Sequence, residues 1–218
     1  SPPAGSLQTL GLAWDDDGGG GAAPDFTTAL IRQGGMALLA DVNVPKWRLW
    51  QPVKNPKTAP KLSLHTLTVG VCRGARDPAV SDAVTVRFGM RTLATSGRHI
   101  LLNGEPIKLK GVNRHDMFPN LGPVLPAAQY GADLDLLQLT LHGNFIRGSH
   151  YPQDDRFLDL CDERGVLVWN EALAWGNSAA TLLDPRFMAA ELGTANAMLD
   201  GSINHASIAL WGFFNEGQ

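Results

Sequence analysis

From residue 97 onward the chain alternates short apolar segments with helical patterns, and no other feature of the sequence constrains the fold as strongly. Strands are expected at 107–111, 145–148, 166–169 and 208–211. Helices are expected between them, at 128–141, 156–164 and 186–199, with Gly165 closing the second helix. Strands joined through helices pair in parallel by right-handed crossovers, so this part of the chain is predicted to form an α/β sheet.

Polar side chains follow each of the expected strands. The clusters are Asn113-Arg114-His115-Asp116, Arg147 to Pro152, Asn170-Glu171 and Asn215-Glu216. Because the carboxyl ends of parallel strands share one rim, these clusters predict a polar pocket where α/β folds bind ligands. Their succession favours half of a barrel over a free-standing open sheet.

The preceding residues follow a different pattern. Residues 1–25 include Asp15-Asp16-Asp17 and Gly18 to Gly21, and we expect a loop or disorder there. In residues 26–96 apolar side chains alternate with polar ones, as at Leu67, Val69 and Val71, which is typical of antiparallel strands. About three strands can be counted where an immunoglobulin-like sandwich has about seven. The predicted fold is therefore a partial immunoglobulin-like β-sandwich at 26–96, followed at 97–218 by the first half of an α/β TIM barrel, with about four βα units.

Composition excludes several partners. The net charge of −3 comes without a basic run, so nucleic acid is not expected. No stretch approaches the roughly 18 apolar residues that span a bilayer, so no membrane partner is expected either. Cys72 and Cys161 lie far apart and predict neither a disulfide framework nor a thiolate metal site. The start at Ser1-Pro2-Pro3 is typical of a processed or excised chain, and the compartment and oligomeric state stay open.

Five motifs occur in one order and spacing. They are Asn103 to His115, Ser149-His150-Tyr151-Pro152, Leu160 to Gly165, Asn170-Glu171-Ala172 and Trp211 to Glu216. Together they closely resemble the catalytic barrel of glycoside hydrolase family 2, the family of β-galactosidases and β-glucuronidases. The resemblance covers residues 97–218 and, more weakly, the segment before them.

The resemblance implies a catalytic residue. Glu216 would be the general acid/base of a retaining, exo-acting β-glycosidase whose substrate is a glycoside or oligosaccharide. A retaining mechanism requires a second carboxylate about 5 Å away as nucleophile. In the family this is a glutamate on a later strand, so we expect the nucleophile beyond Gln218 and the chain by itself to be inactive.

The resemblance also implies the residues around the sugar. Asn215 would donate a hydrogen bond to the sugar 2-hydroxyl. The other expected contacts are His115, His150 and Asn113, with Trp175 able to stack on a sugar ring. Arg147 must be paired if it points inward, with Glu171 or Glu216, and we expect Arg147 and Glu171 to hold the substrate-contacting groups in place. For Arg114 a structural ion pair and a substrate contact remain equal alternatives.

One departure from the family concerns metal. Its magnesium-dependent β-galactosidases carry a glutamate and a histidine shortly after an Asp-Glu-Ala segment. Here Trp175 and Asn177 stand at those positions, and the aspartate is Asn170. We therefore expect no metal and no other cofactor, and galactoside specificity cannot be carried over. Galactose, glucuronic acid and mannose all remain open as the sugar.

Two alternatives remain. A metal-dependent TIM-barrel hydrolase would use His115, His150 and Glu216 around zinc, although it lacks the usual His-x-His of a first barrel strand. A non-catalytic sugar-binding fragment would keep the acid and several sugar contacts but have no nucleophile. A glutamate on a seventh barrel strand, after Gln218, would distinguish an enzyme from such a fragment.

Overall fold

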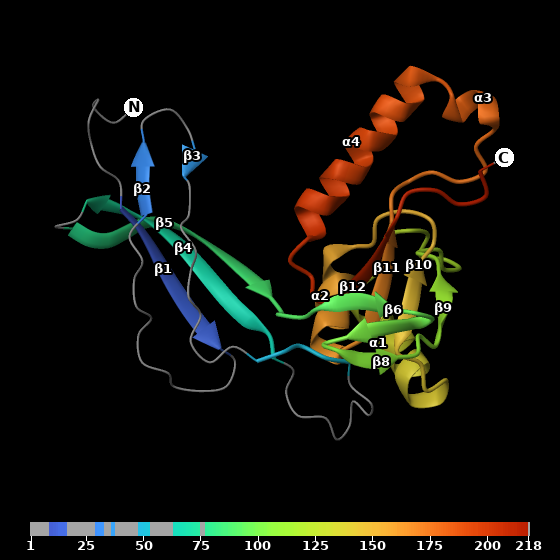
Figure 1. Ribbon diagram of the computed structural model, residues 1–218, viewed down its shortest axis with the longest axis horizontal. Coiled ribbons are helices and arrows are strands. Elements are labelled where there is room, and N and C mark those ends of the chain that lie inside the picture. Colours follow the sequence, from blue (N-terminus) through green and yellow to red (C-terminus); the bar gives the residue numbers. More distant parts are fainter. Residues whose placement is uncertain are drawn as a thin grey trace. The chain divides into compact units, whose positions relative to one another are not determined.

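The computed structural model describes residues 9–16, 29–32, 36–37, 48–52, 63–74 and 77–217 (Figure 1). The chain divides into two compact units. One comprises Ser1–Arg48 and Ser63–Met90, and the other comprises Leu49–Leu62 and Arg91–Gln218.

The first unit contains a five-stranded antiparallel sheet in the order β3-β2-β1-β4-β5. Its strands are β1 (Thr9–Asp16), β2 (Ala29–Arg32), β3 (Met36–Ala37), β4 (His65–Gly74) and β5 (Asp77–Phe88). The expectation of a loop throughout 1–25 is wrong for Thr9–Asp16, because all eight residues pair with β4 and satisfy their backbone there. The rest of 1–25 lies outside the described residues. The described strands of this unit form one sheet, and the sandwich stays a prediction.

The second unit begins with an antiparallel meander of β6 (Leu93–Ser96), β7 (His99–Leu102) and β8 (Glu105–Ile107). A four-stranded parallel sheet follows in the order β12-β11-β10-β9. Its strands are β9 (Gly111–Arg114), β10 (Phe145–Gly148), β11 (Leu167–Glu171) and β12 (Ile208–Gly212). Each strand lies beside its neighbour in sequence, as in one half of a TIM barrel, which confirms the predicted α/β arrangement.

The helices lie between these strands in the sequence. They are α1 (Ala127–Asp135), a π-helical turn η1 (Leu136–Thr140), α2 (Asp155–Arg164), α3 (Ala179–Leu182) and α4 (Pro185–Ser202). Helix α2 has Asp154 as its N-cap and Gly165 as its C-cap. The Asp154 side chain accepts a hydrogen bond from the Arg156 backbone amide, and Gly165 has a left-handed φ of 65°. Both ends therefore follow from local capping chemistry, and the predicted closure at Gly165 is confirmed.

The first barrel strand begins later than predicted. Residues 105–107 belong to β8 of the meander, where Ile107 pairs with Ile100, and the barrel strand starts only at Gly111. A side chain at Gly111 would place its Cβ 1.7 Å from the Phe145 carbonyl oxygen of β10, so β9 needs glycine at this close approach. The prediction of a strand at 107–111 rested on apolar residues such as Ile107. These residues precede β9, and Ile107 belongs to β8.

The core lies between the outer face of the parallel sheet and helices α1 and α2. Ile146, Val168 and Ile208 from the sheet pack with Leu134, Leu137 and Phe157 from the helical layer, and all six side chains are buried. Because strand side chains alternate, the residues between these core positions point to the opposite, barrel-interior face.

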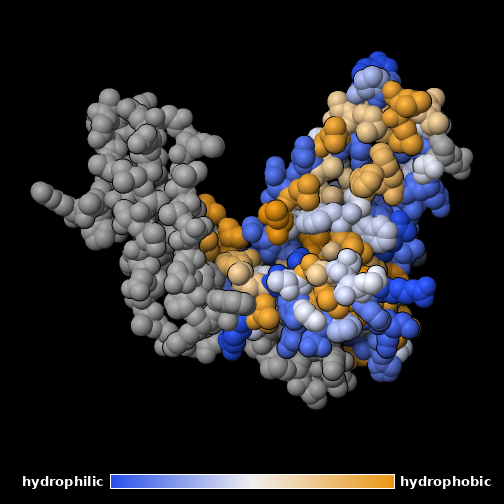
Figure 2. Space-filling model, in the orientation of Figure 1, coloured by the Kyte–Doolittle hydropathy of each residue, from blue (hydrophilic) through white to orange (hydrophobic). Residues whose placement is uncertain are grey.

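Apolar side chains are exposed along the last helical segment. Figure 2 shows them over α3 and α4, where Leu183, Leu192 and Ile203 are all more than half exposed. In a complete barrel, neighbouring helices cover part of the outer layer. Within the described residues, no helix has both the length and the hydropathy needed to cross a bilayer.

Candidate functional site

Residues from three neighbouring strands meet on the interior face of the sheet near its carboxyl rim. Arg147 of β10 pairs in register with Asn113 of β9, and beyond the end of β12 Asn215 pairs with Trp175. Residues paired across parallel strands place their side chains on the same face. The register therefore places Asn113 beside Arg147 and Trp175 beside Asn215, although Asn113 lies within β9 and not after it.

Glu171, at the end of β11, connects these residues. Its Oε1 accepts a hydrogen bond from Arg147 Nε at 2.6 Å, and its Oε2 lies 2.8 Å from His150 Nδ1. Arg147 Nη2 donates to Asn215 Oδ1 at 2.8 Å. Glu171 is only 1% exposed, so a buried carboxylate holds one arginine and one histidine while the arginine holds the asparagine. The pairing of Arg147 is therefore with Glu171.

The neighbouring strand leaves space for this cluster. The Arg147 guanidinium lies 4.7 Å from the centre of the Trp169 ring. A Cβ on Gly212 of β12 would lie 2.3 Å from Trp169 Nε1 and 2.8 Å from Glu171 Cγ. Only glycine fits at position 212 without displacing these side chains.

The two predicted site histidines are neighbours. The rings of His115 and His150 meet edge to face with centroids 5.4 Å apart, and Tyr151 lies 6.2 Å from His115. His150 is partly buried and His115 is exposed. Sequence reasoning missed the contact between His150 and Glu171. The signal available was that Glu171 is two residues beyond Trp169 and so shares its face of β11.

Glu216 and Trp175 both adjoin Asn215, Glu216 as the next residue in the chain and Trp175 through a backbone bridge. Glu216 is exposed and adopts a φ of 52°, in the left-handed region that residues other than glycine rarely occupy. Trp175 is 53% exposed. The neighbours of Asn215 thus include a solvent-accessible carboxylate and an exposed aromatic ring.

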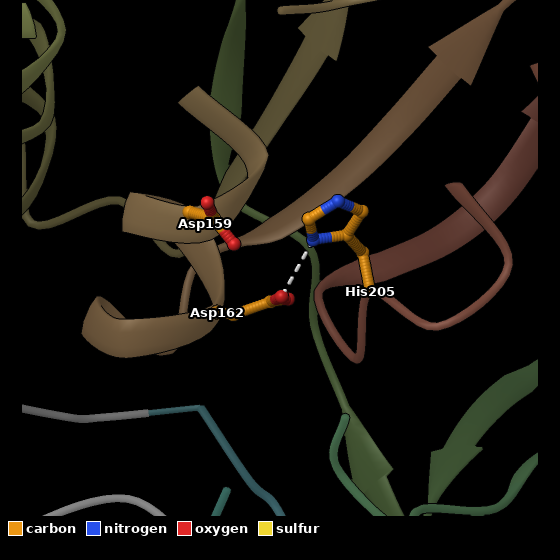
Figure 3. Close-up of side chains that lie close together, drawn as sticks. All are labelled: Asp159, Asp162 and His205. Atoms are coloured by element: carbon orange, nitrogen blue, oxygen red, sulfur yellow. Dashed lines mark hydrogen bonds and ion pairs between the residues drawn. The ribbon is translucent and has the colours of Figure 1, made fainter. Parts of the chain in front are cut away.

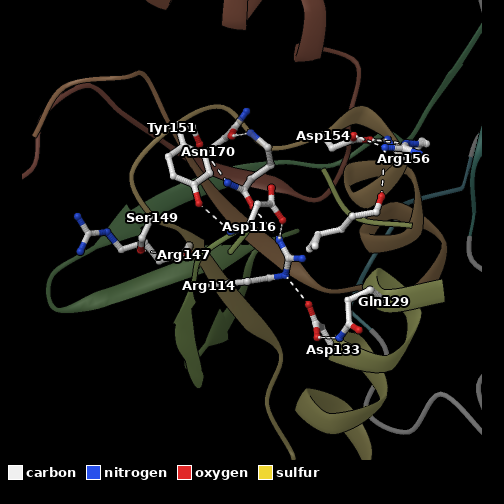
Figure 4. A network of polar contacts seen from close by, with 12 residues as sticks. Arg114, Asp116, Gln129, Asp133, Arg147, Ser149, Tyr151, Asp154, Arg156 and Asn170 are labelled. Carbon is white, nitrogen blue, oxygen red and sulfur yellow. Dashed lines mark hydrogen bonds and ion pairs between the residues drawn. The ribbon is translucent and has the colours of Figure 1, made fainter. Parts of the chain in front are cut away.

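Arg114 points the other way, into the layer between sheet and helices (Figure 4). It donates to Asp116 at 2.5 Å and to Asp133 at 2.8 Å, and it stacks 4.3 Å from the Phe157 ring centre. Asn170 also faces this layer, where its Oδ1 accepts a hydrogen bond from the backbone N–H of Gln153 at 3.0 Å. Of the two alternatives for Arg114, the structure shows the structural ion pair.

One group in the described residues is close enough to share a metal ion, namely Asp159, Asp162 and His205 (Figure 3). It lies where α2 ends and β12 begins, which is the opposite end of the strands. Both Asp162 oxygens are already engaged, one with His205 Nδ1 and one with the Ser207 amide, each at 2.7 Å. His115, His150 and Glu216 form no comparable group in the described part of the chain, which weakens the zinc alternative.

The environment of His205 changes its protonation. Burial lowers its pKa, but the hydrogen bond to Asp162 and the negative charges of Asp162, Asp159 and Asp155 outweigh burial. The net effect raises the pKa of His205 above its ordinary value of 6.5. The raised pKa favours the charged form of His205 in its contact with Asp162, and this contact joins α2 to the start of β12.

An apolar pocket of about 360 Å³ lies elsewhere in the second unit. Its lining includes Leu93 and Ile100 from the meander and Leu210 from β12, and it contains no ionisable side chain. The polar cluster around Glu171 is therefore the better candidate for chemistry.

Comparison with known proteins gives a consistent result. A family model described as "Glycosyl hydrolases family 2, TIM barrel domain" matches residues 93–218. The β-galactosidase of Thermoanaerobacterium thermosulfurigenes is 34% identical over 180 residues, covering 81% of this chain and 23% of that protein. The β-glucuronidase of Sus scrofa is 29% identical over 176 residues, covering 80% of this chain and 26% of its own length.

Solved structures agree. A family 2 β-galacturonidase from Eisenbergiella tayi superposes with a TM-score of 0.79 at 31% identity, over 97% of this chain and 36% of that one. A β-glucuronidase from Bifidobacterium dentium gives a TM-score of 0.80 at 27% identity, over 97% and 32% of the two chains. The chain thus spans only about a quarter to a third of the length of these relatives.

Proposed function

The chain belongs to glycoside hydrolase family 2, and we propose that the natural protein carrying it is a retaining glycosidase that removes terminal β-linked sugars. One observation supports this more than any other. It is the hydrogen bond from Arg147, itself held by Glu171, to Asn215, the residue directly before Glu216.

Glu216 is the proposed general acid/base. A glycosidic oxygen is a poor leaving group unless it is protonated, so the acid must reach the bond that breaks. Glu216 is exposed and directly follows Asn215, which supports this role. Its left-handed backbone turns the chain sharply just after Asn215, and such strained conformations concentrate at functional sites.

The surrounding residues recognise the sugar in this proposal. Asn215 has its side-chain oxygen bound by Arg147, which leaves the Nδ2 amide as donor to the 2-hydroxyl. His115, His150 and Asn113 contact the same sugar from the other strand ends. Trp175, beside Asn215, stacks on a sugar ring or on the leaving group.

The nucleophile is proposed to lie outside these residues. Glu171 is buried and binds Arg147 and His150 with its two oxygens, and Asp116 is paired with Arg114. Of the two glutamates among the predicted site residues, Glu171 and Glu216, only Glu216 is thus accessible. For the 218 residues taken separately, this favours the second candidate function, sugar binding without turnover.

The test is Glu216→Gln in the longest natural protein that carries this sequence. Hydrolysis of β-glycosides with poor leaving groups should fall by about 10² to 10⁴-fold, while activated nitrophenyl glycosides lose far less, because only the former need the proton. Glu105→Gln, an exposed change on β8, serves as the matched control. Equal losses on both substrate types would refute the acid/base assignment.

A panel of nitrophenyl glycosides identifies the sugar that the enzyme removes. The relatives named above are a β-galactosidase, β-glucuronidases and a β-galacturonidase. The panel therefore comprises 4-nitrophenyl β-galactoside, β-glucuronide, β-galacturonide and β-mannoside. No release of nitrophenol from any of them, by protein that is folded, would refute the proposed glycosidase activity.

A further inference from the structure

We propose that Glu171 is a positioning residue that fixes the proton of His150 on Nδ1, so that Nε2 accepts a hydrogen bond from a substrate hydroxyl. The part concerning the substrate rests on the proposed function. The part concerning the histidine proton rests only on the contacts of Glu171.

The Glu171 carboxylate can contact only hydrogen-bond donors. An ionised carboxylate only accepts hydrogen bonds, and an arginine guanidinium only donates them. Oε1 is occupied by Arg147 Nε at 2.6 Å, and Oε2 lies 2.8 Å from His150 Nδ1. A short contact to a carboxylate oxygen requires a donor, so His150 carries its proton on Nδ1.

The charge of Glu171 is balanced without a charge on His150. Arg147 already balances the negative charge of Glu171 through a 2.6 Å ion pair in a site where the carboxylate is 1% exposed. A second positive charge on His150 is not needed to satisfy this carboxylate. Neutral imidazole with its proton on Nδ1 has an unprotonated Nε2, which is an acceptor.

The Nε2 atom of His150 is available to a ligand. Among the described residues Nε2 of His150 has no hydrogen-bond partner, and the side chain is 16% exposed. Glu171 closes one side of the ring and His115 stands against it edge to face. The atom left for a ligand is therefore the acceptor Nε2, which matches a hydroxyl donor and repels a carboxylate or a fluorine.

This arrangement makes Glu171→Gln an informative change. The glutamine oxygen must face Arg147, because Arg147 always presents protons, so the amide NH₂ turns toward His150 Nδ1. Nδ1 must then accept, and the proton moves to Nε2. The variant should convert the group offered to the substrate from an acceptor into a donor while keeping the size of the side chain.

The kinetic experiment uses the longest natural protein that carries this sequence. The substrates are 4-nitrophenyl β-galactoside and β-glucuronide, each with its 3-deoxyfluoro and 4-deoxyfluoro analogues. Fluorine can accept but not donate a hydrogen bond. At the position that His150 contacts, the ratio of kcat/KM for the hydroxyl and fluoro substrates should fall by about tenfold in Glu171→Gln, the equivalent of one hydrogen bond.

Using this ratio removes other effects of the variant. A general loss of packing lowers kcat/KM for both substrates and leaves their ratio unchanged. The inductive effect of fluorine slows only the fluoro substrate, but it does so equally in the wild type and the variant and therefore cancels when their ratios are compared. Glu191→Gln, a buried glutamate on α4 outside the site, is the matched control and should keep the wild-type ratio. An unchanged ratio at both positions in an active Glu171→Gln enzyme overturns the proposal.

The second measurement does not depend on activity. Nitrogen NMR of ring-labelled histidine, with the His150 signal assigned by its loss in His150→Gln, reads the tautomer directly. Wild-type protein should show protonated Nδ1 and unprotonated Nε2, and Glu171→Gln should show the reverse. A wild-type proton on Nε2 overturns the proposal, even if no glycoside is hydrolysed and the proposed function fails separately.

Discussion

Removing the Arg114 guanidinium should lower the free energy of unfolding of the second unit by several kcal/mol. Arg114 is 6% exposed and pairs with Asp116 and Asp133 from the end of β9 and from α1. Truncation to alanine strands two carboxylates, of which Asp116 is only 7% exposed. Breaking a buried ion pair costs about 3–5 kcal/mol, and the lost stacking on Phe157, 4.3 Å away, adds about 1 kcal/mol.

We therefore expect Arg114→Ala to lose about 4 to 6 kcal/mol in the free energy of unfolding. With a urea dependence of about 2 kcal/mol per molar, the midpoint should fall by about 2 to 3 M. The assay is urea unfolding followed by far-ultraviolet circular dichroism. Arg114→Lys should be intermediate, since an ammonium group cannot bridge both carboxylates as a planar guanidinium does.

Two comparisons make the result decisive. Arg186→Ala removes an exposed arginine that pairs with Asp184 at the start of α4, and its midpoint should stay near wild type. Adding Asp133→Asn to Arg114→Ala should recover part of the loss, because it removes one stranded charge. A loss below about 1 kcal/mol in Arg114→Ala would refute the view that this ion pair holds β9 against α1.

Three further predictions can be checked on the same protein. The raised pKa of His205 stabilises the fold most below pH 6.5, where the histidine is charged in both states, and this contribution disappears as pH rises through the folded pKa. The difference in unfolding free energy between wild type and His205→Gln should thus be larger at pH 6 than at pH 8, and the opposite order would contradict the pairing with Asp162. Gly212→Ala should displace Trp169 or Glu171, lowering kcat/KM at least about tenfold, whereas wild-type kinetics would show that β12 can yield. Dialysis against EDTA should leave hydrolysis unchanged, and activity that is lost and then restored by magnesium would return the metal-dependent alternatives.

Elements with strong local signals could be predicted from the sequence. The apolar residues of β10 at Phe145–Gly148 agree with prediction at both ends, and α2 agrees to within one residue because Asp154 and Gly165 cap it. The beginning of β9 could not be predicted in this way. Ile107 and Leu109 are as apolar as a barrel strand, and only the pairing of Ile107 with Ile100 assigns the first of them to the meander.

The N-terminal region shows the same limit. Thr9–Asp16 ends in acidic residues next to glycines, which locally favours a loop, yet the segment pairs along its whole length with β4. The pairing partners lie 49 residues further along the chain at Asp16–His65 and 63 residues further at Thr9–Cys72. Local composition contains no information about such a partner.

By itself the sequence determined the parallel βα architecture and the identity of the rim residues, because apolar periodicity and residues such as Asn215 and Glu216 are local properties of the chain. Only the tertiary structure decided how those residues are used. Arg114 is the last residue of β9 and Arg147 the last but one of β10, yet Arg114 faces the helices and binds Asp116 and Asp133 while Arg147 faces the barrel interior and binds Glu171. The physical reason is that a strand places alternate side chains on opposite faces, so the role of each charge depends on strand register and on partners from distant segments.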